Sequence, residues 1–275
     1  MKLEALFEQP NALPVAPKIV QELINSFDNE SVSPDEIARK LAIDPVLSAK
    51  LLRLANSAYY HVSRSVSSVN DAISMLGFVT VRTLVVSSGL VHGFKSAPGM
   101  DLKQFWRYSL ETAVAAKWLA SRAHQNTDMA FTLGMMHAIG QLVIHAGMPE
   151  QALQVDRIAG ILDPRRFSTE RTSFGYDYAG VGAELASRWK FPETFAAAIR
   201  AFPQPMNQQP FNPMAGIIHL ASWLARAGEN KLTQGEIQAT CPTEVFSCLG
   251  LDPGVLLKEM PPLSELSAGL EDLVS

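Results

Sequence analysis

The chain has 275 residues, of which 47% are hydrophobic and 18% are charged, and this balance is typical of a packed globular protein and excludes a disordered chain. Its 23 basic and 27 acidic residues give a formal net charge of −4, so it carries no overall electrostatic attraction to nucleic acid or to an anionic membrane. The two cysteines, Cys241 and Cys248, match no zinc-ligand spacing and cannot form a disulfide framework, which favours a reduced, cytoplasmic location.

The first residues carry no signal for export. Residues 1–9 hold charged side chains and no long apolar core, so they do not resemble a signal peptide. Residues 11–17 hold two prolines and are expected to be extended. We expect no apolar stretch to reach the about 18 residues that a membrane-spanning helix needs, and therefore no membrane association.

Helical spacing begins after the two prolines. The first expected helix has one apolar face, made of Ile19, Val20, Leu23, Ile24 and Phe27. Ser33 and Pro34 indicate a second helix start, where the serine caps free backbone N–H groups and Glu36 completes a capping box. Asp44-Pro45 indicates a third start, and Asn56-Ser57 can end that helix because both side chains bond to nearby backbone.

Two more helices are expected in the N-terminal part. Ser68 opens one that Gly77 can close. Residues 79–86 fit either a strand or a helix, and we favour a helix because no partner strand is evident. Residues 95–101 contain Pro98 and Gly99 and form the best candidate linker. We therefore assign residues 1–97 to an N-terminal helical subdomain.

The second half also has helical spacing. Helices are expected over residues 101–122, from Asp128 through Leu142, over 177–189, from Pro192 to about 199 and over 214–227, with a proline-rich loop over 202–213. The basic run of Arg165, Arg166 and Arg171 is interpreted as a solvated loop. These elements form a predicted core over residues 98–230.

A C-terminal helical extension is expected over residues 231–275. Thr233 and Asp252-Pro253 are typical helix starts. The last residues, 261–275, fit either a loosely docked helix or a frayed tail. Taken together, the elements predict an all-α protein.

Several runs resemble the signature of the HDOD domain family, a relative of the HD-type metal-dependent phosphohydrolases. The most specific are Asp44-Pro45 and residues 55–60, which read Ala-Asn-Ser-Ala-Tyr-Tyr. The others, in the expected order, are Leu13-Pro14, residues 72–77, residues 81–85, Phe105-Trp106, residues 130–137, Ile139-Gly140, residues 182–185 and residues 189–192. The resemblance spans roughly residues 11 to 227. It implies an N-terminal helical bundle packed on an HD-like multi-helix core.

The resemblance also implies where a metal site would stand. In the hydrolases an adjacent His-Asp pair supplies two ligands, and here that pair reads His137-Ala138, with no lone pair on the alanine side chain. Tyr108, Tyr178 and Ser222 stand at about the positions of other ligands.

The expected His-His element reads Arg200-Ala201-Phe202, and no aspartate or glutamate lies between Met206 and Arg226. His219 would be a weak second donor, and Asp177 is expected to cap a helix. Known catalytic zinc sites use three or more protein ligands, so we predict a degenerate site with no metal and no cofactor.

Three functions stay open at this point. The favoured one is a non-catalytic regulatory or signal-transduction module that binds a signalling protein, with the vestigial cleft filled or reused. The second is a metal-dependent phosphohydrolase or phosphodiesterase acting on a nucleotide or cyclic dinucleotide. The third is a sensor that holds a nucleotide-like ligand in the cleft. No direct nucleic-acid contact is expected, and a homo-oligomer stays open.

One surface turn stands out as a candidate partner surface. It contains Asn56, Tyr59, Tyr60 and Arg64, and tyrosine and arginine are enriched at binding hot spots. The structural alternative is that the two tyrosines pin the turn to the core or to a neighbouring subdomain.

Overall fold

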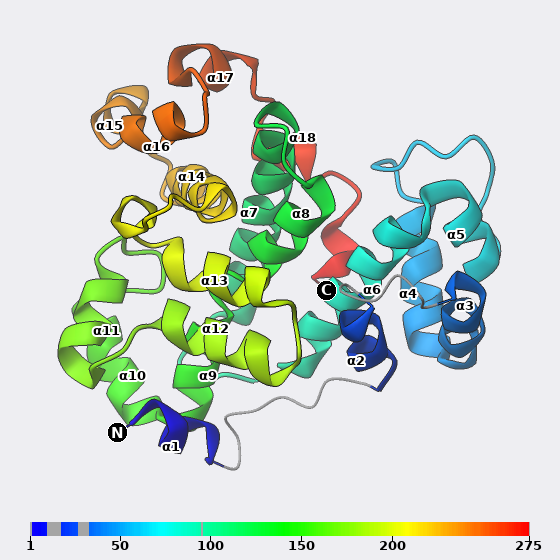
Figure 1. Cartoon of the computed structure of the whole chain (residues 1–275), viewed down its shortest axis with the longest axis horizontal. Coiled ribbons are helices and arrows are strands. Elements are labelled where there is room, and N and C mark those ends of the chain that lie inside the picture. Colours follow the sequence, from blue (N-terminus) through cyan, green and yellow to red (C-terminus); the bar gives the residue numbers. More distant parts are fainter. Residues whose placement is uncertain (1, 10–17, 27–32, 95, 275) are drawn as a thin grey trace.

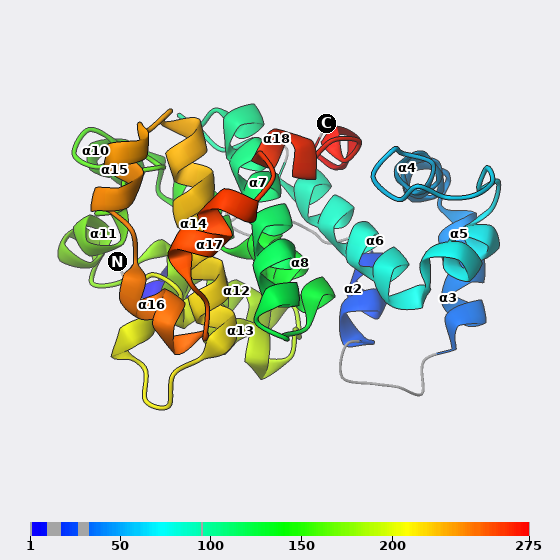
Figure 2. The ribbon, with the colours of Figure 1, turned by 90° about the horizontal axis from the view of Figure 1, so that it is seen from above.

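The computed structural model describes residues 2–9, 18–26, 33–94 and 96–274, and within these ranges the chain forms helices and no β-strand. The predicted all-α fold class is confirmed. A small helical group lies at one side, a larger group lies at the other, and one helix runs between them (Figures 1 and 2). The predictions for Leu13-Pro14, residues 11–17, Phe27 and Lys95 lie outside the described residues.

The small group is an N-terminal bundle. The first helices are α1 (Leu3–Phe7), α2 (Lys18–Asn25), α3 (Pro34–Ile43), α4 (Pro45–Ala55), α5 (Val69–Leu76) and α6 (Phe78–Gly93). Helices α2, α4 and α5 pack on α6, and α3 packs on α2, α4 and α5. Helix α6 also contacts the larger group, and α1 packs on the larger group rather than on this bundle. Residues 79–86, which fitted either a strand or a helix, are thus helical. Helix α6 is buried on nearly all sides, and this explains why its sequence lacks a polar face.

Helix starts follow the capping residues in most cases. Asp44 Oδ1 accepts hydrogen bonds from the N–H groups of Val46 and Leu47, both at 3.0 Å, and Ser68 does the same for Asp71 at 3.0 Å. The capping box expected at Ser33 is wrong, because the serine side chain makes no capping hydrogen bond. Its helix begins with Pro34 instead, and the expected partner Glu36 pairs with Lys40 at 2.8 Å.

The larger group is built on two sets of helices. They are α7 (Leu102–Arg122), α8 (Thr127–Met136), α9 (Ile139–Gly147), α12 (Tyr178–Arg188), α13 (Glu193–Ala201) and α14 (Pro213–Glu229). Helix α7 packs on α8 and α14, and α12 packs on α9 and α13. The close crossings need glycine: a Cβ on Gly140 would clash with the Tyr178 carbonyl and lie 2.7 Å from the Gly182 nitrogen.

The helix predicted from Asp128 through Leu142 is wrong in two respects. It begins at Thr127 with Asn126 as its cap, at 2.8 Å from the Met129 nitrogen. It then breaks at His137 and Ala138, and α9 follows as a separate helix that packs on α12 rather than on α7.

Two helices appear where none was expected, α10 (Pro149–Asp156) and α11 (Arg166–Phe174). The solvated-loop interpretation of this region is wrong, because Arg166 is only 1% exposed. Its guanidinium pairs with Asp156 at 2.5 Å and with Glu170 at 2.7 Å. Arg165 is exposed as expected.

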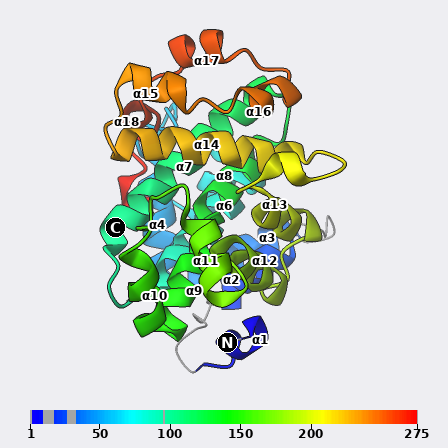
Figure 3. The same cartoon turned by 90° about the vertical axis from the view of Figure 1, so that its left-hand side faces the viewer.

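The C-terminal extension is helical. It contains α15 (Gln234–Ala239), α16 (Thr243–Cys248), α17 (Pro253–Glu259), α18 (Leu263–Leu266) and η2 (Glu271–Leu273), and a short η1 (Pro205–Asn207) precedes α14. The helix starts predicted at Thr233 and Asp252-Pro253 are confirmed, and the first of them forms a full capping box with Glu236. Figure 3 shows α15, α16 and α17 on the outer side of α14.

The last residues form a docked tail, which we define as residues 263–274. Helix α18 packs on α7, and η2 packs on α4 and α6. Leu270 and Leu273 are both 0% exposed, so the frayed-tail alternative is wrong. The tail therefore joins the two helical groups.

The expectation that no stretch is apolar enough to cross a bilayer is also wrong. Thr127–Gly147, which covers α8 and α9, spans 21 residues, and its most apolar 18-residue window has a mean hydropathy of 1.3. However, 89% of its most apolar window is buried inside the fold, as is usual for a core helix of a soluble protein.

Candidate functional site

Aromatic rings occupy the position that the sequence assigns to a metal site. We name Tyr108, His137, Tyr178 and Phe202 the aromatic cluster. The ring centroids lie 5.0 Å apart for Tyr108 and His137, 5.5 Å for His137 and Phe202, and 6.0 Å for Tyr178 and Phe202. All four side chains are at most 7% exposed, so the rings fill this region rather than line an open cleft.

Phe202 was not among the predicted cleft residues. The sequence did contain a hint of its position, because Phe202 belongs to the run 200–202 that replaces the expected His-His element. What spacing did not reveal is that this phenyl ring points between the imidazole and the second tyrosine.

His137 is held in one neutral form. Its Nδ1–H donates to the Gly134 carbonyl at 2.7 Å, which leaves Nε2 as the atom with a lone pair. Nε2 is buried and has no hydrogen-bond partner among the described residues. Burial lowers the pKa of His137 to about 3, so the ring is uncharged at neutral pH.

Ser222 and His219 also serve the packing of this region. His219 Nδ1–H donates to the Phe202 carbonyl at 2.9 Å, and Ser222 Oγ donates to the His219 carbonyl at 3.0 Å. Ala138 is buried and contributes only a methyl group. These contacts fix Phe202 in the cluster.

A cationic side chain faces the cluster. Arg226 Nη1 donates to the Tyr108 hydroxyl at 3.5 Å. Burial lowers the pKa of His137 first, and the positive charge of Arg226 lowers it further. An HD-like core implies a divalent metal ion at this position. Here that ion would be repelled by the Arg226 guanidinium and would find one nitrogen lone pair, on His137.

The residues present therefore do not fit a metal. Among the described residues, no three histidine, cysteine, aspartate or glutamate side chains are arranged to hold an ion. Asp177, considered as a stray ligand, caps α12 by accepting the Gly180 N–H at 2.8 Å and pairs with Arg171 at 2.5 Å. The donor set is too small for the metal chemistry of the hydrolases.

The buried ion network around Arg166 adjoins the cluster and was missed from the sequence. Glu170 accepts the backbone N–H of Tyr178 at 2.6 Å, and Arg166 donates to His145 Nε2 at 3.3 Å. Burial raises the pKa of Glu170 to about 7 and lowers that of His145. His145 Nδ1–H donates in turn to the Pro98 carbonyl at 2.9 Å. The network thus positions the start of α12.

The predicted partner surface lies at a joint. The Asn56 side chain closes the turn by bonding to both the N–H and the carbonyl of Val66, each at 2.8 Å. Tyr59 and Tyr60 are half-buried, with centroids 4.8 Å apart, and Arg64 faces Asp71 at 3.6 Å.

The tail covers part of the same turn. A Cβ on Gly269 would lie 3.1 Å from the Tyr59 nitrogen, and Arg53 pairs with Asp272 at 3.3 Å. The Lys117 ammonium of α7 lies 5.7 Å from the Tyr59 ring centroid. The tyrosines therefore make intramolecular contacts, while Arg64 stays exposed.

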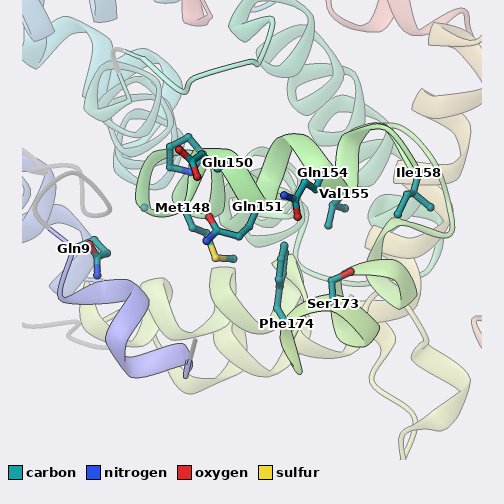
Figure 4. A pocket seen from close by; sticks show the side chains of 11 residues that line it. Gln9, Met148, Glu150, Gln151, Gln154, Val155, Ile158, Ser173 and Phe174 are labelled. Carbon is teal, nitrogen blue, oxygen red and sulfur yellow. The ribbon is translucent and has the colours of Figure 1, made fainter.

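One hollow lies away from the cluster, between α10, α11 and the end of α1 (Figure 4). Its volume is about 590 Å³, and Gln151 and Gln154 lie on one side with Phe174 on the other. Among the described residues that line it, Glu150 is the only one with a charged side chain. Without a lysine or arginine, this hollow does not fit a nucleotide-like ligand.

Comparison with known families decides the relationship that the fold suggests. The family model of the HDOD domain matches residues 13–205. The chain belongs to the HDOD domain family. The match covers the N-terminal bundle and the core as far as η1, and it ends before α14 and the tail.

Individual relatives agree with this assignment. A solved structure from Shewanella amazonensis SB2B, named as a candidate phosphohydrolase, is 31% identical, covers 99% of this chain and 96% of its own, and has a TM-score of 0.80. One from Marinobacter aquaeolei VT8, named as a candidate signal transduction protein, is 25% identical, covers 99% of this chain and 60% of its own, and has a TM-score of 0.74.

A curated relative extends the comparison to a longer protein. An uncharacterised protein of Treponema pallidum (strain Nichols) is 24% identical over 219 residues, which are 78% of this chain and 42% of the relative. The HDOD chain therefore spans about two fifths of the length of this relative.

Proposed function

We propose that this HDOD protein is a non-catalytic signalling module that acts by binding a protein partner. The observation that carries the proposal is the aromatic cluster. A metal hydrolase needs several converging lone pairs at this position. This chain instead has three aromatic rings, one neutral imidazole and, nearby, the guanidinium of Arg226. A side chain that is 0% exposed, as His137 is, meets no substrate without an opening of the core.

The names of the relatives include both a hydrolase and a signalling protein. One relative is named as a candidate phosphohydrolase, and another as a candidate signal transduction protein. The chemistry of the residues favours the second, because a hydrolase must activate water on a bound metal and this donor set supplies one nitrogen.

The deciding experiment measures metal content and turnover together. Purified protein is loaded with Mn²⁺, analysed by mass spectrometry for bound metal, and assayed on bis-p-nitrophenyl phosphate and on a cyclic dinucleotide. We expect no stoichiometric metal and no turnover above that of His137→Ala. Manganese-dependent turnover that His137→Ala abolishes, and that the exposed control His124→Ala retains, would overturn the proposal.

The partner surface is tested separately. Arg64 is exposed at the Asn56 to Arg64 turn, and we expect Arg64→Glu to remove a specific partner in a pull-down from the native host. Arg157→Glu, at an exposed arginine at the end of α10, is the control and should retain that partner. Identical captured proteins for both variants would exclude this turn as the docking site.

A further inference from the structure

A second pocket lies between α7 and the tail. Its volume is about 620 Å³. Leu102, Trp106 and Leu110 line it from α7, and their spacing of four residues places them on one helical stripe. Val274 lines it from the tail. The size and the apolar wall fit a small organic ligand.

One carboxylate in this pocket lacks a partner. Glu111 stands one position beyond Leu110, is half-buried, and lines both this pocket and the adjoining one beside α17. No hydrogen bond or ion pair joins it to another residue of the described ranges. Burial, together with the negative charge of Glu229, raises the pKa of Glu111 to about 7. A cation placed here would stabilise the ionised carboxylate and so offset both effects.

The neighbouring arginine does not supply that cation. Arg107 donates two hydrogen bonds to Glu229, at 2.6 and 2.7 Å, in a bidentate pair. Lys103 is exposed at the rim, where Glu271 of the tail also lies. Because Arg107 is matched by Glu229, its positive charge only partly offsets the burial of the Glu111 carboxylate.

We propose that this pocket binds a small organic amine, whose ammonium group pairs with the Glu111 carboxylate while its apolar body lies along Leu102, Trp106 and Leu110. The site goes beyond the proposed signalling function and does not depend on the absence of catalysis. Its position gives it a route to the rest of the molecule, because the tail that forms one wall also packs on α4 and α6. An occupied pocket would hold the tail against α7.

The test uses 2-phenylethylamine as the probe and the full chain. Binding is followed by titration calorimetry and by the fluorescence of Trp106, with Trp106→Phe to identify its signal among the four tryptophans. The neutral analogue 2-phenylethanol and the anion 3-phenylpropanoate have similar apolar bodies. We expect the amine to bind roughly tenfold more tightly than the alcohol, as for the loss of a hydrogen bond to a charged group, and the anion to bind weakest.

Two variants locate the site. Glu111→Gln keeps the volume and removes the charge, so it should lower the affinity for the amine to that for the alcohol. Val274→Trp should fill the pocket and remove binding of both. Glu244→Gln, at an exposed carboxylate on α16, is the matched control and should bind like the unchanged protein.

The pH dependence has a defined sign. An alkylammonium group stays charged up to about pH 10, as lysine does, whereas Glu111 must lose its proton to form the pair. Affinity should therefore rise as pH increases through about 7 and level off above it, with release of a proton at pH 7. Equal binding of amine and alcohol, or an amine affinity that is unchanged in Glu111→Gln, would overturn the proposal.

Discussion

The role of some single residues in this fold depends on whether they are buried, and the neighbouring sequence does not indicate this. Arg166 is the clearest case, since a run of arginines usually lies in solvent. Its partners stand 4, 10 and 21 residues away, at Glu170, Asp156 and His145. Only the first separation carries a local signal, because residues four apart meet on one helix face. The other two contacts require the tertiary packing of α9 and α10.

Removing the Arg166 side chain should therefore be costly. In Arg166→Met the buried carboxylate of Glu170 loses its cation, and we expect the free energy of unfolding to fall by about 3–5 kcal/mol. Urea unfolding at pH 7.5 measures this. Arg165→Met is the matched control, because that arginine is 75% exposed and solvent screens its pair with Asp163, so the change in stability should be much smaller. Similar losses in the two variants would show that the network does not stabilise the fold.

At the scale of helices, most predicted starts that rest on a local capping signal are confirmed, and the Ser33 capping box is the exception. Asp44, Ser68, Asp177, Thr233 and Asp252 each cap the helix expected after them. The break at His137-Ala138 has no such signal, since neither residue is a helix breaker. It follows from packing, because α8 contacts α7 while α9 must contact α12.

The crossing of α9 and α12 gives a sharp test of that packing. Gly140→Ala would drive a methyl group into the backbone of Tyr178 and Gly182, and neither helix can shift without its neighbours. We expect a loss of about 3 kcal/mol or more in thermal or urea unfolding. Gly235→Ala, in the first turn of α15 with nothing within 4 Å, should change stability by less than about 1 kcal/mol and in the stabilising direction. A small effect at Gly140 would mean that the crossing is wider.

For the whole molecule, the family resemblance gave the HDOD relationship and the all-helical architecture, and it anticipated that Tyr108, His137 and Tyr178 would gather at one place. It did not anticipate Phe202 between them. The tail was left open, because its leucines have no capping signal and no counterpart in the family motif. Its docking depends on a groove that exists only after α4, α6 and α7 have assembled.

The tail should contribute measurably to the stability of the assembled molecule. Leu273→Ala removes a fully buried side chain between α4 and α6, and we expect a loss of about 2–4 kcal/mol. Limited proteolysis should then cut the tail sooner. Val255→Ala trims an apolar residue that is 51% exposed on α17, and should cost no more than about 0.5 kcal/mol. Equal effects would contradict a role for the tail in joining the two groups.

The apolar segment Thr127–Gly147 also has a consequence for biosynthesis. It is apolar enough to pass a length and composition test for a membrane helix, yet much of its burial comes from α12 and α14, which the ribosome produces later. Translation from Gly147 to Glu229 at 5–20 residues per second takes roughly 4–16 seconds. During that interval α7 is the main helix that packs on the apolar surface of α8. The segment therefore reaches its full burial only after α14 has been translated.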